Sequence, residues 1–267
     1  VLISSPDDLQ LCRSSSASFY YQLPNAMNSA CDGLVQLFAH NRQLIPWFPS
    51  LLIGDDYIAA VRFLHEIRPA RIVTDNTGIA FAASRAGIAW IAGPQLNLVN
   101  SYSLLCLQEQ FNCSGAFISN EINRMQIKAI KRPAGFELHY RIYHPIELMT
   151  SLQCLFHQVT GCAKHTMDGS CIAQCEKRAA ITNLKDESFV VEKSKGNFHH
   201  LYNESNFLNT DIIADIPGMF TGFAIDLRRI PTGIGMAADP LTIITHFEQL
   251  LSGNPDSAQA LRQMLHP

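Results

Sequence analysis

Several features that would indicate a function class directly are missing from the sequence. No run of eighteen apolar residues occurs, so no membrane-spanning helix is expected. The GxSxG elbow of α/β-hydrolases, the HExxH helix of metalloproteases and a glycine-rich phosphate loop are also absent. A hydrolase would therefore lack a visible nucleophile or metal-activated water, although a dispersed triad leaves no local signature.

Charge is scarce as well. Charged residues make up 16% of the chain, and the formal net charge is −3. This mild acidity gives no general support for nucleic-acid binding. What the sequence has in quantity is apolar side chains, which account for 47% of its 267 residues. That is enough for one large core, or for one core with an appendage.

Strands and helices alternate through the first 150 residues. Short apolar runs predict strands at Val1–Ser4, Phe19–Leu23, Leu44–Phe48, Arg71–Thr74, Ala89–Ala92, Gly115–Ser119 and Glu137–Tyr143. Helices are predicted at Tyr57–Ile67, Thr77–Ala86 and Ser101–Phe111. In the first of these, Ile58, Val61 and Leu64 form an apolar stripe. About seven such units predict an α/β fold of the (β/α) TIM-like barrel type.

The regular alternation of strands and helices ends in the later part of the chain. Further strands are predicted at Ser188–Glu192 and Gly222–Leu227, and helices at Leu241–Leu251 and Ser257–Leu265. We therefore expect residues 1–150 to form the main part of the barrel. Residues 151–240 would hold a cysteine-rich insertion and the closing strands, and residues 241–267 the C-terminal helices of a small α+β extension.

Four of the eight cysteines fall in one short segment, at Cys154, Cys162, Cys171 and Cys175. Four convergent thiolates suit a zinc ion or an iron–sulfur cluster. Structural zinc sites prefer two to four residues between ligands, and only the last pair, Cys171 and Cys175, has such a spacing. The spacings of seven, eight and three residues suit a loop around a 4Fe-4S cluster at least as well. A disulfide knot or a segment without metal remains an alternative.

The other four cysteines, Cys12, Cys31, Cys106 and Cys113, are scattered, and we expect them to be buried hydrophobes. Without secretory features, eight cysteines argue for reduced thiols and a cytoplasmic location.

Polar residues follow several predicted strands, where a barrel places its functional side chains. Among them, Asp75, Glu121 and His144 are candidates for catalysis. Asn97, His200 and Arg228 are candidates for substrate contact. Simpler interpretations are that His144 is a hydrogen-bonded histidine that orients the cysteine segment, and that His200 packs in a turn or in the core.

The order of several segments resembles the U32 peptidase family, also called collagenase-like peptidases. The segments are VTDNTGIAFAASRAGI, GPQLNLVNSYS, SGAFISNEINRMQIKAI, PIELMTSLQC–x7–C, TNLKDESFVVEK, FHHLYNES and GFAIDLRRI. The resemblance implies a barrel in which Cys154, Cys162, Cys171 and Cys175 match positions that hold a four-iron cluster in several members. Those members support hydroxylation of RNA bases or of the ubiquinone precursor ring, and protease activity is the family's historical label.

Two departures resemble the second, C-terminal barrel of the longer family members. Only eight residues separate Cys162 from Cys171, and Pro145 follows His144 where many members have a His-Gly pair. The chain also begins with Val rather than Met, so we expect it to be a fragment of a longer one. A paired barrel or a missing N-terminal half would then carry the substrate site.

Three functions follow as hypotheses. The first is a cluster-bearing protein that supports a hydroxylation, with RNA or a small aromatic ring as its substrate. The second is a peptidase, and the third is a non-catalytic partner half that binds a cluster. An RNA partner would bind through its phosphates, and basic residues should then surround one mouth of the barrel. They are Arg124, Lys128, Lys131, Arg178 and Arg228.

Overall fold

The computed structural model of this chain describes residues 1–159, 161–164, 166–193, 198–230 and 238–265. The chain divides into two units. The first unit consists of Val1–Ile142 and Asn209–Arg228. The second consists of Tyr143–Leu208 and the described residues from Arg229 onward.

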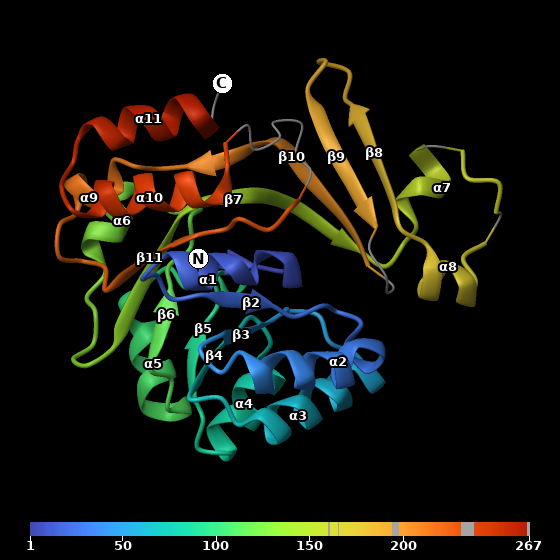
Figure 1. Ribbon diagram of the computed structural model, residues 1–267, viewed down its shortest axis with the longest axis horizontal. Helices are drawn as coiled ribbons and strands as arrows, with labels where there is room; N and C mark the ends of the chain where they lie inside the picture. Colours follow the sequence, from blue (N-terminus) through green and yellow to red (C-terminus); the bar gives the residue numbers. More distant parts are fainter. Residues whose placement is uncertain (160, 165, 194–197, 231–237, 266–267) are drawn as a thin grey trace. The chain divides into compact units, whose positions relative to one another are not determined.

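Short parallel strands form the centre of the first unit (Figure 1). They are β1 (Leu2–Ile3), β2 (Tyr20–Gln22), β3 (Ile45–Phe48), β4 (Arg71–Thr74), β5 (Ala89–Ala92), β6 (Gly115–Phe117) and the start of β7 (Glu137–Ser151). Each strand pairs in parallel with the next one. β11 (Gly222–Ile225) pairs with β7, and a parallel bridge joins Asp226 to Leu2 of β1. The sheet therefore curls into a barrel-like arrangement, and the predicted α/β barrel-like fold is confirmed.

Large side chains fill the inside of this curled sheet. The cluster takes one residue from each of seven strands, namely Leu2, Tyr20, Trp47, Val73, Ile91, Phe117 and Ala224. Trp47 is its centre, because its ring centroid lies 5.7 Å from that of Tyr20 and 5.0 Å from that of Phe117. Side chains in a strand alternate between its two faces, so these positions share the inner face while their neighbours meet the helices.

Helices connect the strands of the first unit. They are the 3-10 helices η1 (Pro6–Gln10) and η2 (Pro94–Leu96), and α1 (Leu11–Ser14), α2 (Met27–His40), α3 (Asp55–Ile67), α4 (Thr77–Arg85), α5 (Ser101–Phe111), α6 (Arg124–Ala129) and α9 (Ile212–Asp215). The predicted apolar stripe of α3 is wrong in one respect, because Ile58 is 66% exposed. Leu64 of the predicted stripe is buried, and it shares its face of the helix with the buried residues Ala60 and Phe63.

Antiparallel strands form the second unit. The later part of β7 pairs with β10 (His199–Leu208), β10 with β9 (Ser188–Lys193), and β9 with β8 (Lys177–Thr182). Only β9 was predicted from the sequence in this group. β8 alternates exposed and half-buried side chains at the edge of the sheet, and β10 is interrupted by register shifts. The sequences of both strands also mix polar with apolar residues, so neither has the continuous apolar run from which a strand would be predicted.

Helices complete the second unit. The cysteine segment contains α7 (Leu155–Val159) and α8 (Gly169–Gln174), and the chain continues through α10 (Pro240–Leu251) and α11 (Asp256–Leu265). α10 begins where expected, because the Asp239 side chain accepts hydrogen bonds from the backbone nitrogens of Leu241 and Thr242. Within the described ranges, no helix is both long enough and apolar enough to cross a membrane.

Candidate functional site

The cysteine segment lies in the second unit. Cys154 immediately precedes α7, Cys171 lies in α8, and Cys175 is the C-cap of α8 with an extended backbone. All four cysteines of the segment, including Cys162, are half-buried free thiols. Asp168 caps α8 by accepting a hydrogen bond of 2.9 Å from the backbone nitrogen of Cys171. The helix therefore fixes the position of Cys171 but ends before Cys175.

Three of the four thiols line one cavity of about 290 Å³. Its walls include Cys154, Cys162, Cys171, Leu152, Gln153, His157, Lys164, Thr166 and Met167. Cys175 is not part of this lining. Among the residues that the structure describes, no three His, Cys, Asp or Glu side chains are close enough together to hold a metal ion. The fold thus brings three thiols to one space without bringing the four sulfurs together.

Two lysines lie beside Cys162, and one of them, Lys164, lines this cavity. The Lys177 ammonium lies 3.6 Å from the Cys162 sulfur. A hydrogen bond from the Lys164 backbone nitrogen and, secondarily, the Lys177 ammonium lower the pKa of the Cys162 thiol. The Lys164 ammonium also bonds to the Asp168 carboxylate at 2.9 Å. A lowered pKa favours the thiolate, the form in which cysteine binds a metal.

The expectation for the scattered cysteines holds for two of them. Cys31 and Cys113 are buried, and the Cys113 thiol donates to the Gly115 carbonyl at 3.0 Å. Cys12 is half-buried. The expectation is wrong for Cys106, which is exposed on α5.

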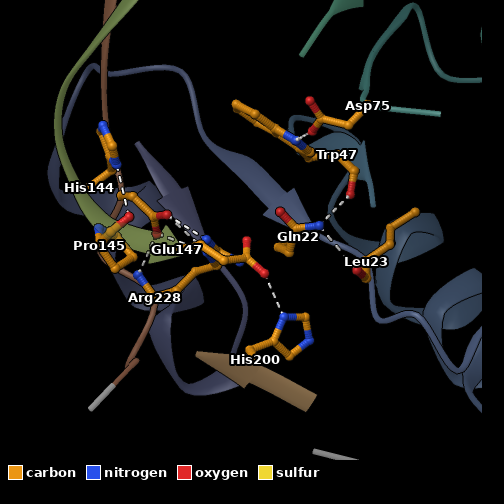
Figure 2. A network of polar contacts seen from close by, with 10 residues as sticks. Gln22, Leu23, Trp47, Asp75, His144, Pro145, Glu147, His200 and Arg228 are labelled. Carbon is orange, nitrogen blue, oxygen red and sulfur yellow. Dashed lines mark hydrogen bonds and ion pairs between the residues drawn. The ribbon is translucent and has the colours of Figure 1, made fainter. Parts of the chain in front are cut away.

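Asp75 lies in the first unit, directly after β4, and is buried. Its carboxylate accepts a hydrogen bond of 2.8 Å from the Trp47 indole nitrogen (Figure 2). It accepts another of 2.7 Å from the Gln95 backbone nitrogen. Burial raises the pKa of Asp75 to about 6, against the opposing effect of these hydrogen bonds and of Arg141 and Arg228. A carboxyl with such a pKa can exchange protons near neutral pH.

The chain leaves room for this carboxylate at Gly93. A Cβ atom at Gly93 would lie in severe overlap with Oδ1 of Asp75. Two other candidates follow later strands of the same unit. Glu121 is exposed, and Asn97 has the left-handed backbone conformation, with φ of 52°.

Arg228 follows β11 and forms an ion pair with Asp226. Its Nη2 atom lies 2.6 Å from Oδ2 of Asp226, and its Nε atom lies 2.9 Å from Oδ1. Asp226 is buried, whereas the Arg228 side chain is 22% exposed. The pair therefore holds one guanidinium in a fixed orientation at the end of this strand.

His144 lies on β7 in the second unit and is buried. Its Nδ1 atom lies 2.9 Å from the Pro145 carbonyl oxygen, to which it can only donate, and its ring stacks on Phe207 at 5.0 Å. The His144 ring is therefore held by one hydrogen bond and one aromatic contact.

His200 lies on β10 and contacts Glu147 of β7, with 2.6 Å between Nδ1 and Oε1 (Figure 2). Thr150 donates to the same carboxylate oxygen at 2.6 Å. Glu147 and Thr150 were not among the sequence candidates. The two partners are 53 residues apart, and only the pairing of β10 with β7 brings them together.

Three of the five basic residues proposed for RNA are ion-paired with acids. Arg124 pairs with Asp215 at 2.8 Å, Arg178 with Glu192 at 3.2 Å, and Arg228 with Asp226. Lys128 and Lys131 are exposed at the end of α6 and just after it. Arg178 belongs to the second unit and the other four to the first.

The sequence matches one family model, described as Peptidase family U32, over residues 54–256. The match includes the strands from β4 onward, the cysteine segment and the strands that follow it. No curated protein and no solved structure matches the chain.

Proposed function

The chain belongs to peptidase family U32, and from this membership we propose that its clustered cysteines bind an iron–sulfur cluster with which it supports a hydroxylation. The observation that carries the proposal is the cavity lined by Cys154, Cys162 and Cys171. Cys175, the C-cap of the helix that contains Cys171, would supply the fourth ligand. Such a cluster, when bound, exchanges electrons over a wide range of potentials.

The donor set fits the proposed group in its chemistry. Iron–sulfur clusters are held by cysteine thiolates, and four thiols lie within this one segment. Lys164 and Lys177 stabilise the anionic form of the Cys162 sulfur. All eight cysteines are free, as expected in a reducing compartment, and we propose that the protein is cytoplasmic.

A hydroxylation agrees with this donor set better than peptide hydrolysis does. Hydrolysis needs no electrons, so a redox centre would have no direct use in it. The Glu147–His200 pair and Asp75 offer acid–base groups, and the hydroxyl that bonds to the pair is that of Thr150. The peptidase alternative has the family's name as its support.

We favour an RNA base as the substrate over a free aromatic ring. Lys128 and Lys131 are exposed and can meet phosphates. The Arg124–Asp215 pair is also exposed, at 56% and 36% of the two side chains, so it stabilises the protein little. A phosphate can replace Asp215 at little cost and so recruit a third cation.

The test has a genetic arm and a chemical arm. Deletion of the coding region, followed by digestion of total RNA and mass spectrometry, should reveal a nucleoside lighter by one oxygen. Unchanged RNA together with an altered ubiquinone precursor would indicate the ring substrate. Unchanged RNA together with gelatin cleavage by the purified chain, abolished by a point mutation, would overturn the proposal in favour of a peptidase. A bound cluster with no change in either substrate would indicate a non-catalytic partner.

A further inference from the structure

A β-bulge in β7 builds the Glu147–His200 pair. Leu201 is paired with Met149 but the next residue, Tyr202, is paired with Glu147, so Leu148 is an extra residue in β7. In a regular strand, residues three apart point to opposite faces. Because of the extra residue, Glu147 and Thr150 both point to the face of the sheet that carries His200. Bulges often re-aim a side chain in this way beside active sites.

The pair belongs to a row of polar side chains across the strands. Thr150 of β7, His200 of β10, Glu192 of β9 and Arg178 of β8 are paired in register. The Arg178 guanidinium neutralises Glu192 at 3.2 Å, and this leaves Glu147 as the carboxylate bonded to His200. Among the described residues, Glu192 and Arg178 are the charged side chains that the pairing of β9 and β8 places in line with His200.

The hydrogen bonds determine which imidazole nitrogen carries the proton. Thr150 donates its hydroxyl proton to Oε1 of Glu147, so this oxygen acts as an acceptor. His200 must then bond to it through a protonated Nδ1 atom, and the neutral ring has its lone pair on Nε2. The ring stacks on Tyr202 at 6.0 Å, which holds its plane. The His200 side chain is 17% exposed and that of Glu147 24%, so the pair is accessible to a ligand.

We propose that His200 transfers a proton to and from the substrate through Nε2, and that Glu147 is the residue that positions it. The ligand would carry a weakly acidic N–H or O–H on a ring, as a uracil-type base and a phenol both do; this part rests on the proposed function. In the step, the substrate N–H or O–H bond breaks, an H–Nε2 bond forms, and the electron pair stays on the substrate atom. Glu147 remains ionised and stabilises the imidazolium.

The first test uses cells that lack the chromosomal copy and carry the wild type, H200Q, E147Q or one of two control variants. The controls are H65Q and E109Q, at exposed positions of α3 and α5. We expect H200Q to lower the oxygen-bearing nucleoside at least tenfold and E147Q to lower it by less. Both variants should keep wild-type iron and sulfide content and a wild-type melting temperature. Wild-type nucleoside levels in H200Q, or a loss that occurs only together with loss of the cluster, would overturn the proposal.

If H200Q does not fold, the nucleoside level, cluster content and melting temperature of E147Q are used in its place.

A second test does not depend on RNA modification at all. Purified, cluster-loaded protein with ¹⁵N-labelled histidine is titrated with uridine and with phenol. A shift of the His200 Nε2 resonance with uridine alone supports a base in RNA, and one with phenol alone supports a free ring. No shift with either compound overturns the proposal, whereas failure of the proposed function would appear separately as protein without iron and sulfide.

Discussion

The Trp47 indole donates a hydrogen bond of 2.8 Å to the buried carboxylate of Asp75 inside the first unit (Figure 2). This contact joins the aromatic centre of the curled sheet to the end of β4. A carboxylate in such a place loses its hydration, and its few hydrogen bonds offset that loss only in part, as the pKa of about 6 indicates.

Asp75 should make the stability of the protein depend on pH. The carboxyl pKa is about 6 in the folded chain, whereas the ordinary aspartate pKa is 3.8, so the unfolded chain releases its proton first as pH rises. The free energy of unfolding should therefore fall between about pH 4 and pH 6, by on the order of 3 kcal/mol. D75N should remove this fall, as measured by urea unfolding at several pH values. The same pH dependence in D75N as in the wild type and in the E109Q control would contradict this role of Asp75.

Gly93 should not tolerate a side chain. A methyl group there meets the Asp75 carboxylate, so G93A should destabilise the protein by about 1–3 kcal/mol. G33A is the matched control, because nothing lies within 4 Å of a Cβ at Gly33 inside α2. It should be neutral or stabilise the protein by up to about 1 kcal/mol. Equal unfolding midpoints for both variants would show that the Asp75 carboxylate does not require a glycine at position 93.

The scattered cysteines should differ in reactivity. Cys106 is exposed and should react with iodoacetamide in the native protein. Burial raises the pKa of the Cys113 thiol to about 12, so Cys113 should react only after unfolding. Peptide mass spectrometry after timed labelling measures both sites. Rapid labelling of Cys113 under native conditions would contradict its placement beside Gly115.

Lys128 and Lys131 should contribute to RNA affinity without affecting the fold. Each change to alanine should weaken binding of a short single-stranded RNA and reduce the salt dependence of log Kd by about 1. R62A is a suitable control, because it removes the same charge from an exposed position on another helix, α3. The same loss of affinity in R62A, or none in the lysine variants, would argue for a free ring as the substrate.

Most of the first unit could be predicted because its elements are local patterns. β4 and β5 have the predicted bounds, since each is a short apolar run buried on both sides. The apolar face of α3 was misplaced at Ile58, since spacing alone does not show which side of the helix meets the sheet. β8 and β10 were missed because their stability comes from pairing with distant strands.

The candidate sites divide in the same way. The cysteine segment is evident from the density of cysteine, a residue whose reactivity is informative wherever it lies. The Glu147–His200 pair depends on the bulge at Leu148. A bulge is defined by the pairing of two strands, and these two residues are 53 positions apart, so no local sequence pattern predicts it. The raised pKa of Asp75 likewise results from burial. Two polar residues in a row, Asp75 and Asn76, instead suggest an exposed turn in the sequence.

The most direct test of the central claim is the iron, zinc and acid-labile sulfide content of anaerobically purified protein. We expect about four iron and four sulfide per chain, lost in C154S, C162S, C171S and C175S but kept in C106S. About one zinc without sulfide would favour a structural zinc site. No metal at all, or loss of iron in C106S alone, would contradict the claim that these four cysteines bind an iron–sulfur cluster.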